Sequence, residues 1–393
     1  MKIIGDIQGS KILLLQGPMG TFFRKLDQYF TRHGAVTYKI CFNAGDRLFA
    51  LRKNRVDYRG NSQQWRGYIT TFLQDQGIRK IFLFGNCRFY HKEAIQVAKE
   101  LGIEVYVFEE GYIRPNYITL EKNGVNGDSA ISHDPEFYAD LNADNTAEEL
   151  PARNNYRAMA FQATFYYLAA FFFQPFYPHY QHHRELSPLK EAFYGIRNLL
   201  RKIKYRVKER SCASLLGNQL KYKYYFVPLQ TRIDFQIKEY SRYQDIETFI
   251  KEVIYSFSRN APASTSLVIK HHPMERGMAT YDNYIEKLAQ QYDVRKRVIS
   301  VHDACLPTCL ANAIGTITIN STVGLSSLFH NTPTITLGTA VYDMEGLTAH
   351  GVTLDEFWTK YKKPDRLLFR KFRSHVISKT QLNSGFYGIF PNF

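Results

Sequence analysis

Short β-like runs alternate with stretches of helical periodicity twice along the chain, and this alternation constrains the fold more than any other feature of the sequence. In the first half these runs are Ile12–Leu15, Val36–Phe42, Lys80–Phe84 and Glu104–Phe108. In the second half they are Tyr224–Pro228, Ser266–Lys270, Arg297–Val301, Thr316–Ile319 and Thr334–Leu337. Strands that alternate with helices form parallel sheets with crossover helices. The sequence therefore predicts an α/β fold of two doubly wound, Rossmann-like domains with a cleft between them.

The length and composition agree with two globular domains. At roughly 100–200 residues per domain, a chain of 393 residues is long enough for two. Its 45% hydrophobic and 22% charged residues supply large cores and exclude disordered, collagen-like and disulfide-rich chains. We place a first domain at 1–150, an aromatic and basic helical linker at 151–215, and a second domain at 216–393.

The middle of the chain concentrates positive charge and aromatic rings. Residues 151–210 contain 11 basic and 3 acidic side chains, and so contribute +8 of the formal net charge of +15. Their first part, Ala158–Tyr177, has an apolar run of about 16 residues, shorter than the roughly 20 that span a bilayer. In the second part, Ile196–Arg210, apolar residues at helical spacing alternate with basic ones, among them Arg197, Arg201, Lys202, Lys204, Arg206 and Lys208. Such a segment suits the anionic surface of a membrane, or else forms a pair of interdomain helices with a solvated basic side.

Other features narrow the class of protein. The sequence has no G-x-G-x-x-G and no G-x-x-x-x-G-K-[ST], so dinucleotide-dependent dehydrogenases and P-loop NTPases lose their main support. The 5 cysteines are scattered without a second pair at zinc spacing, which predicts reduced thiols rather than a metal site. The N-terminal segment lacks the continuous apolar run of a signal peptide, so we expect the protein to stay inside the cell. Basic residues do not surround separated stacking aromatics, which disfavours nucleic acid as a partner.

Polar loops follow the strands of the first half, where doubly wound sheets bind their ligands. Gln16, Gly17 and Gly20 lie in QGPMGTFF, whose glycines permit either a tight turn before a helix or a close approach of the backbone to an anion. Asn43 and Asp46 lie in FNAGD after the next strand, and FGNCRFY follows a third. Each loop alone is a weak indication of a site.

Two acids, Glu109 and Glu110, precede Gly111 in the segment EEGYIRP. Successive side chains of an extended segment point to opposite sides, so one carboxylate can face a ligand and the other solvent or a structural partner. A carboxylate so placed can serve as a general base, or as a nucleophile toward an anomeric carbon. A solvated pair of acids before a turn gives the same pattern.

The second half supplies groups suited to a phosphate. One group is the KHHP motif at a strand end, where cationic side chains can neutralise a leaving phosphate: Lys270, His271, His272 and Pro273. A second group ends another strand and opens a helix, whose N-terminus attracts anions: Asn320, Ser321 and Thr322. Together with an acid in the other domain, these are the parts of a two-domain sugar-nucleotide transferase. Because the sequence has no Asp-x-Asp pair, we expect these groups to support the leaving phosphate without a metal.

Taken in order, QGPMGTFF, FNAGD, EEGYIRP, FVPLQTRIDFQI, KHHP and NSTVGLSSLFHNTPTITLG resemble the capsule polysaccharide Kdo transferases of Gram-negative bacteria, the KpsS/LipB type. The resemblance runs over nearly the whole chain. It implies a GT-B glycosyltransferase that uses CMP-β-Kdo to place the first β-linked Kdo on (lyso)phosphatidylglycerol, which starts the poly-Kdo linker of a capsular polysaccharide. It further implies a retaining, metal-independent reaction with no cofactor beyond the CMP-β-Kdo donor.

The acid–Gly and His–Pro pairs also resemble the two motifs of bacterial sialyltransferases, whose donor is likewise CMP-activated. Matched residue by residue, the resemblance makes Glu110 the acid, with Glu109 in reserve, and His272 the imidazole at the donor. Ser321 and Thr322 match the Ser/Thr pair near the donor phosphate. Sialyltransferases invert configuration whereas the Kdo family is expected to retain it, so the role of Glu110 as a base does not transfer directly. The acceptor side or cleft is expected to contain Gln16, Gly17, Gly20, Asn43, Asp46 and Arg114.

A lipid acceptor has to be reached from the cytoplasm, so the resemblance favours the membrane interpretation of the middle segment. It implies a peripheral location on the inner face of the cytoplasmic membrane, with a linker-extending Kdo transferase and the capsule export complex as possible partners. Two alternatives stay open: another CMP-sugar GT-B transferase, such as a sialyltransferase or the linker-extending Kdo transferase, and a non-catalytic scaffold in capsule assembly.

Overall fold

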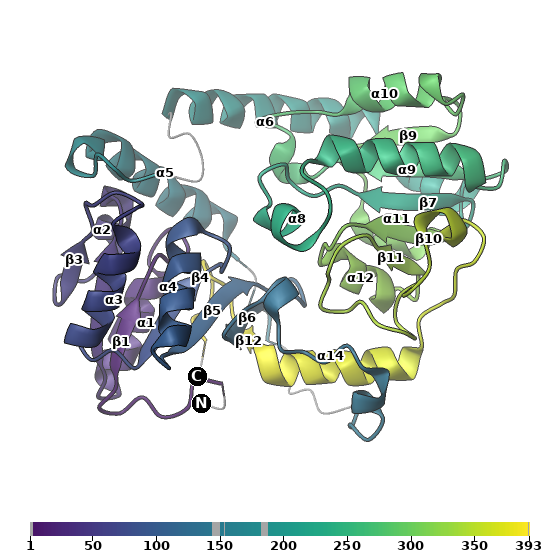
Figure 1. Cartoon of the computed structure of the whole chain (residues 1–393). Helices are drawn as coiled ribbons and strands as arrows, with labels where there is room; N and C mark the ends of the chain where they lie inside the picture. Colours follow the sequence, from purple (N-terminus) through teal and green to yellow (C-terminus); the bar gives the residue numbers. More distant parts are fainter. Residues whose placement is uncertain (1–2, 144–149, 153, 182–187, 392) are drawn as a thin grey trace. The chain divides into compact units, whose positions relative to one another are not determined.

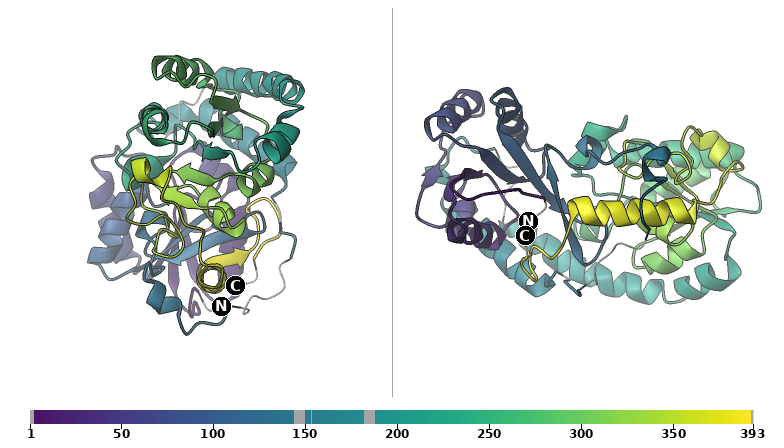
Figure 2. Two further views of the ribbon diagram at one scale, coloured as in Figure 1. Left: turned by 90° about the vertical axis from the view of Figure 1, so that its right-hand side faces the viewer. Right: turned by 90° about the horizontal axis from the view of Figure 1, so that it is seen from below.

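The computed structural model describes residues 3–143, 150–152, 154–181, 188–391 and 393, which divide into two compact units (Figures 1 and 2). Unit 1 contains the described residues of 1–130, 145–188 and 376–393. Unit 2 contains those of 131–144 and 189–375. The middle segment is therefore shared between the units rather than forming a separate linker.

Unit 1 is built on a seven-stranded sheet with the order β12-β6-β5-β4-β1-β2-β3. Its strands are β1 (Lys11–Leu14), β2 (Val36–Cys41), β3 (Arg55–Asp57), β4 (Lys80–Phe84), β5 (Glu104–Glu110), β6 (Tyr117–Lys122) and β12 (Gln381–Asn383). Its helices are α1 (Phe22–Arg32), α2 (Ala44–Phe49), α3 (Trp65–Asp75), α4 (Phe89–Glu100) and α5 (Tyr156–Phe172). Strands β1 to β5 are parallel, while β6 and β12 pair antiparallel at one edge.

Alternation of side chains along β1 places apolar groups on both faces of this sheet. Leu13 packs into a core with Trp65 and Ile69 of α3, whereas Ile12 packs into a second core with Phe30 of α1. Because successive strand residues point to opposite faces, a strand buried on both sides needs an almost continuous apolar run. The sequence of β1 meets this requirement, and helices accordingly cover both faces of the sheet.

Unit 2 is built on a five-stranded parallel sheet with the order β11-β10-β7-β8-β9. Its strands are β7 (Tyr224–Pro228), β8 (Ser266–Lys270), β9 (Val298–Val301), β10 (Gly315–Thr318) and β11 (Thr334–Thr336). Its helices are α6 (Pro188–Lys208), α7 (Cys212–Ser214), α8 (Phe235–Tyr240), α9 (Ile246–Asn260), α10 (Asp282–Gln291), α11 (Leu306–Ala311), α12 (Val323–Phe329), α13 (Leu354–Phe357) and most of α14 (Arg366–Thr380).

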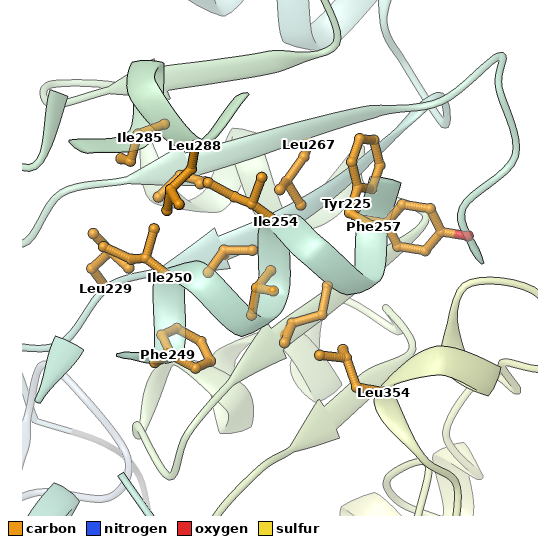
Figure 3. Packing of buried hydrophobic residues seen from close by; sticks show 14 of the residues in the cluster. Tyr225, Leu229, Phe249, Ile250, Ile254, Phe257, Leu267, Ile285, Leu288 and Leu354 are labelled. Atoms are coloured by element: carbon orange, nitrogen blue, oxygen red, sulfur yellow. The ribbon is translucent and has the colours of Figure 1, made fainter. Parts of the chain in front are cut away.

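The main core of unit 2 lies between its sheet and helix α9 (Figure 3). Ile250, Ile254 and Phe257 recur at helical spacing in α9, and all are fully buried. They pack with Tyr225 of β7 and Leu267 of β8. Burial of such side chains contributes roughly 1.5–3 kcal/mol each, so this face holds the helix against the sheet.

Both sheets share one topology, because in each the first strand in sequence is central and the chain moves outward to one side and then to the other. The predicted α/β fold with two doubly wound units is confirmed. The short parallel edge strand β3 and the antiparallel strands β6 and β12 were not predicted. The chain turns back directly after β5 to form β6, and the C-terminal strand β12 pairs with β6, so residues 376–393 belong to unit 1 and not to the second domain.

Candidate functional site

The switch point of the unit 1 sheet lies between β1 and β4, where the strand order reverses. In such sheets ligands bind at the carboxyl ends of the strands beside this point. Gln16 follows β1 and Arg88 follows β4, and the Arg88 guanidinium donates a hydrogen bond to Oε1 of Gln16 at 2.8 Å. The predicted residue Gln16 therefore lies at the switch point, together with Arg88, which was not among the predicted site residues.

Gln16, Asn43 and Asp46 follow the ends of the neighbouring strands β1 and β2 and form one buried polar cluster. The side-chain amide of Gln16 donates to both oxygens of Asp46 at 3.2 Å. The hydroxyl of Tyr166 in α5 donates to Asp46 at 2.9 Å and accepts from the Asn43 amide at 2.8 Å. Burial, and next the charge of Asp46, raise the pKa of Tyr166, which therefore stays a neutral donor.

The Gly17–Gly20 loop packs against α5. The side-chain oxygen of Gln162 accepts the backbone N–H of Thr21 at 2.8 Å, just before α1 begins. A Cβ on Gly20, whose φ is +119°, would lie 2.0 Å from the same oxygen. These glycines were expected to serve either a tight turn or the binding of an anion. The structure shows the tight turn, because the Gln162 side chain already accepts the N–H that an anion would use. The pocket beside this loop, lined also by Asp46, holds about 20 Å³, room for a single water.

Glu109 and Glu110 end β5 and are both half-buried. The Glu109 carboxylate accepts the backbone N–H of Glu110 at 2.9 Å. Glu110 lies near Tyr387, since burial first and the charge of Glu110 second raise the pKa of that phenol. A Cβ on Gly111 would lie 2.1 Å from the backbone oxygen of Tyr117, so glycine is required for β6 to return beside β5.

Arg114 is exposed and lies beyond this turn, where its Nε donates to the backbone oxygen of Gly111 at 3.1 Å. It is tied to the turn that follows Glu110. It does not take part in the hydrogen bonds given above for Gln16, Asn43 and Asp46.

The switch point of unit 2 lies between β7 and β10. As in unit 1, two side chains that follow the flanking strands are joined there by a hydrogen bond. The side-chain amide of Gln230, after β7, donates to the Asn320 side-chain oxygen at 3.0 Å, after β10. Ser321 Oγ accepts the backbone N–H of Val323 at 3.2 Å, and Thr322 is the residue immediately before α12 (Val323–Phe329). Thr322 therefore occupies the predicted N-cap position but makes no side-chain capping hydrogen bond, and Asn320, Ser321 and Thr322 remain half-exposed.

The KHHP motif divides into buried and accessible side chains. Lys270 is buried, and its ammonium donates to the backbone oxygen of His302 at 3.0 Å; burial lowers its pKa. His271 is buried, with Nε2 at 3.0 Å from Oγ of Ser300. His272 is half-exposed, and Pro273 is exposed. Lys270 and His271 therefore act as structural partners within unit 2, contrary to their expected direct role at a phosphate, because both side chains point into it.

His272 presents a defined tautomer to its surroundings. Its Nδ1 accepts the backbone N–H of Met274 at 3.2 Å, at the start of a short 3₁₀ turn. In a neutral imidazole the proton then resides on Nε2, which becomes a hydrogen-bond donor. Of the two histidines between which the sequence left the choice open, His272 is the more accessible and His271 is buried.

Helix α6 faces unit 2 with its polar side and solvent with its apolar side. Arg197 and Arg201 donate to the backbone oxygens of Met278 and Arg276, at 3.5 and 3.0 Å. The exposed side chains include Phe193, Ile196, Leu199, Leu200, Ile203 and Val207, with Lys202, Lys204, Arg206 and Lys208 beside them. The predicted membrane role of Arg197 and Arg201 is therefore corrected, since these two arginines hold the helix to unit 2.

Helix α5 of unit 1 and the turn after it also expose a row of aromatic rings. They include Phe161, Phe165, Phe172, Phe173 and Phe176. Contiguous exposed apolar groups of this kind are uncommon on soluble monomers and mark interaction surfaces. Among the described residues, no helix is long and apolar enough to cross a bilayer.

Two doubly wound units with polar loops at their switch points define a class: α/β proteins built to bind ligands at the carboxyl ends of their strands. Sequence comparison identifies the family. The family described as "Capsule polysaccharide biosynthesis protein" matches residues 79–387. The capsule polysaccharide export protein KpsS of Escherichia coli is 39% identical over 381 residues, which cover 97% of this chain and 98% of KpsS. The capsule polysaccharide modification protein LipB of Neisseria meningitidis serogroup B is 35% identical over 390 residues, covering 97% and 93%. The chain belongs to this capsule polysaccharide biosynthesis family.

Similar solved structures include Thermosulfurimonas dismutans KpsC, a beta Kdo 2,7 transferase, with a TM-score of 0.41 and 14% identity over 92% of this chain and 89% of that chain. The lipopolysaccharide outer core galactosyltransferase WaaB is similar with a TM-score of 0.37 and 9% identity, covering 94% of this chain and 99% of that chain.

Proposed function

We propose that the protein is a glycosyltransferase that transfers the first β-Kdo from CMP-β-Kdo to (lyso)phosphatidylglycerol, with retention of configuration and without a metal. This begins the linker of a capsular polysaccharide. Membership of the capsule polysaccharide biosynthesis family supports the pathway. The ordered motifs, from QGPMGTFF to NSTVGLSSLFH, support the donor and the acceptor.

The observation that carries the proposal is the position of His272 and of the Asn320–Thr322 turn at strand ends on the two sides of β7 in unit 2. These groups follow β8 and β10, the two neighbours of β7, at the carboxyl edge of the sheet. An imidazole with its proton on Nε2 donates to a phosphate oxygen, and the residues of the turn follow a strand end at the same edge and are half-exposed. The interactions of the imidazole and of the turn with the phosphate would both strengthen as negative charge develops on the departing CMP.

Glu110 is the acid assigned to the sugar. In a retaining reaction it acts either as the nucleophile or as an electrostatic stabiliser of the positively charged transition state. Glu109 is less suited to this role because its carboxylate already accepts the neighbouring backbone N–H.

The exposed helices support an acceptor that resides in a membrane. α5 offers aromatic rings, and α6 offers an apolar stripe with lysines beside it. Apolar groups that enter the interface and cations that attract anionic lipids are the two components of peripheral binding. We therefore propose that the protein acts on the inner face of the cytoplasmic membrane, which contains the acceptor phosphatidylglycerol.

The test incubates purified protein with CMP-Kdo, generated in place, and fluorescent phosphatidylglycerol, followed by mass spectrometry of the lipid. Wild type should add the mass of one Kdo, and Glu110→Gln should lower the rate at least about a hundredfold. Glu109→Gln is the matched control and should retain most activity. Product that is insensitive to Glu110→Gln would keep the activity but remove Glu110 from it.

Thermal stabilisation by CMP separates the remaining alternatives. A protein that is stabilised by CMP but leaves the lipid unmodified would be a CMP-sugar transferase for another acceptor. A protein that shows neither stabilisation nor product would be a scaffold, because a ligand that binds the folded state raises its melting temperature.

A further inference from the structure

Three side chains from successive segments of unit 2 converge on the carboxylate of Asp282, the first residue of α10. Ser300 of β9 donates to it at 2.6 Å. His302, just after β9, places Nε2 at 3.0 and 3.1 Å from its two oxygens. His271, just after β8, places Nε2 at 3.0 Å from the Ser300 hydroxyl and 3.4 Å from the carboxylate. These four residues are called the Asp282 cluster below.

Two imidazoles and a carboxylate within 4.8 Å of one another have the composition of a metal site. Their orientation does not suit one. The rings of His271 and His302 are stacked with centroids 4.0 Å apart and an interplanar angle of 19°. The nitrogen lone pairs lie in the ring planes, so two nearly parallel, stacked rings cannot both direct a lone pair at one ion. The cluster is instead a hydrogen-bonded network in which Nε2–H groups and a hydroxyl donate toward an anionic carboxylate.

The protonation states agree with this network. Burial alone would raise the pKa of Asp282, but the hydrogen bonds from His271, His302 and Ser300 outweigh burial and hold that pKa below its usual range. Burial lowers the pKa of His271, which therefore stays neutral. An anionic acceptor with donors around it gives charge-assisted hydrogen bonds, which are stronger than neutral ones.

The inner face of α6 closes the cluster. The Tyr205 ring stacks on His302 with centroids 3.7 Å apart and an interplanar angle of 5°. One turn further along, the Glu209 carboxylate accepts the backbone N–H groups of His302 and Asp303, both at 2.8 Å. Helix α6 thus presents its apolar stripe to solvent and its polar side to this network.

The cluster borders the segment assigned to the donor phosphate. His271 is the residue before His272, and its backbone N–H donates to the oxygen of Val301 at 2.9 Å. Further along the same turn, the buried carboxylate of Glu275 accepts the backbone N–H of Arg232 at 3.1 Å. The backbone before His272 and the side chain of Glu275 after it are therefore both held by other segments of unit 2.

We propose that Asp282, His302 and Tyr205 are positioning residues, which fix His271 and through it the orientation of the neighbouring His272. This inference rests on the proposed function for the role of His272 at a phosphate. It adds that α6, the helix with the exposed apolar stripe, also supports the donor site from its other face.

Hydrogen exchange in the peptide that contains 271–281, measured without any ligand, tests the positioning itself. Asp282→Asn keeps the size of the side chain but removes its charge, and Tyr205→Ala removes the stacked ring. Each should raise exchange in that peptide about tenfold while leaving peptides of unit 1 unchanged. Tyr205→Phe, which keeps the ring, should restore the wild-type rate.

Titration with CMP tests the link to the donor. Asp282→Asn and Tyr205→Ala should raise the Kd for CMP, and the KM for the donor, about tenfold, whereas the KM for the lipid stays unchanged. Unchanged exchange and unchanged CMP affinity in both folded variants would overturn the proposal. So would one equivalent of Zn²⁺ that stays with wild-type protein through dialysis and is lost from Asp282→Asn. Faster exchange in the variants, combined with a wild-type protein that binds no CMP, would support the positioning role and refute the proposed function.

Discussion

Replacing two apolar side chains on the outer side of α6 should weaken binding to anionic vesicles without disturbing the fold. Leu199 and Ile203 lie one helical turn apart and are 60% and 58% exposed. Because most of each side chain is in solvent, the double variant Leu199→Ser, Ile203→Ser removes little packing. Burial in a bilayer interface would be the main interaction that it loses.

The exposed fractions set the size of the effect. Full burial of a leucine or isoleucine side chain contributes about 1.5–3 kcal/mol. Somewhat more than half of each side chain is exposed and can be buried when α6 inserts into the interface. Its burial contributes about 1 kcal/mol per residue, and about 2 kcal/mol for the pair, to the free energy of membrane binding. A free-energy difference of about 2 kcal/mol corresponds to a change of about 30-fold in the partition coefficient.

Sedimentation with vesicles of phosphatidylcholine and phosphatidylglycerol measures this coefficient. The double variant should bind about 30-fold more weakly than wild type. Leu367→Ser removes another exposed leucine of unit 2, 49% exposed and lying on α14, and should bind like wild type. Equal binding by wild type and the double variant, with circular dichroism unchanged, would refute insertion of α6.

Two further predictions concern charge. Exchange of Lys202, Lys204 and Arg206 for glutamine should weaken binding to anionic vesicles by about 1 kcal/mol per residue at low salt and less at high salt, which sedimentation over a salt series measures. His91 is buried, its Nδ1 lies 2.7 Å from the backbone oxygen of Gly85, and burial followed by a nearby arginine lowers its pKa to about 3. Below its unfolded pKa of about 6.5, only the unfolded state takes up the proton, so stability should fall by about 1.4 kcal/mol per pH unit down to about pH 3. In wild type, His91 should make the free energy of unfolding about 2 kcal/mol lower at pH 5 than at pH 7. His91→Asn, which keeps a donor toward that oxygen, should abolish this part of the pH dependence in urea unfolding. An unchanged pH dependence would contradict the lowered pKa of His91.

Local patterns predicted the parallel strands other than β3, and the crossover helices between them, because the periodicity of such elements is visible within about ten residues. The strand β12 could not be found in this way. Gln381–Asn383 is a short segment whose partner, Tyr117–Lys122, lies far away in sequence, so its pairing depends on tertiary structure rather than on periodicity. The same contact explains why the C-terminal residues return to unit 1.

The candidate site was predicted by residue type and strand-end position, whereas the direction of each side chain was not. Periodicity identified α6 as amphipathic but could not reveal that Arg197 and Arg201 would bind backbone oxygens and leave the apolar stripe outside. Tyr166 was one of many aromatic residues in an apolar helix, and nothing in its spacing distinguished the hydroxyl that completes the cluster of Asn43 and Asp46.

Burial separates the two switch points, although the topology of their sheets is the same. In unit 1, α5 covers the loop after β1, so that Gln16 and Asp46 bond to protein groups and their pocket holds about one water. In unit 2, Asn320 and Ser321 stay half-exposed although the Gln230 amide joins the same two strand ends. A nucleotide requires polar groups that water, and hence a phosphate, can reach. Accessibility therefore supports the proposal that unit 2 binds the donor, and it favours the half-buried Glu110 over the covered Asp46 as the acid that the proposal assigns to the sugar.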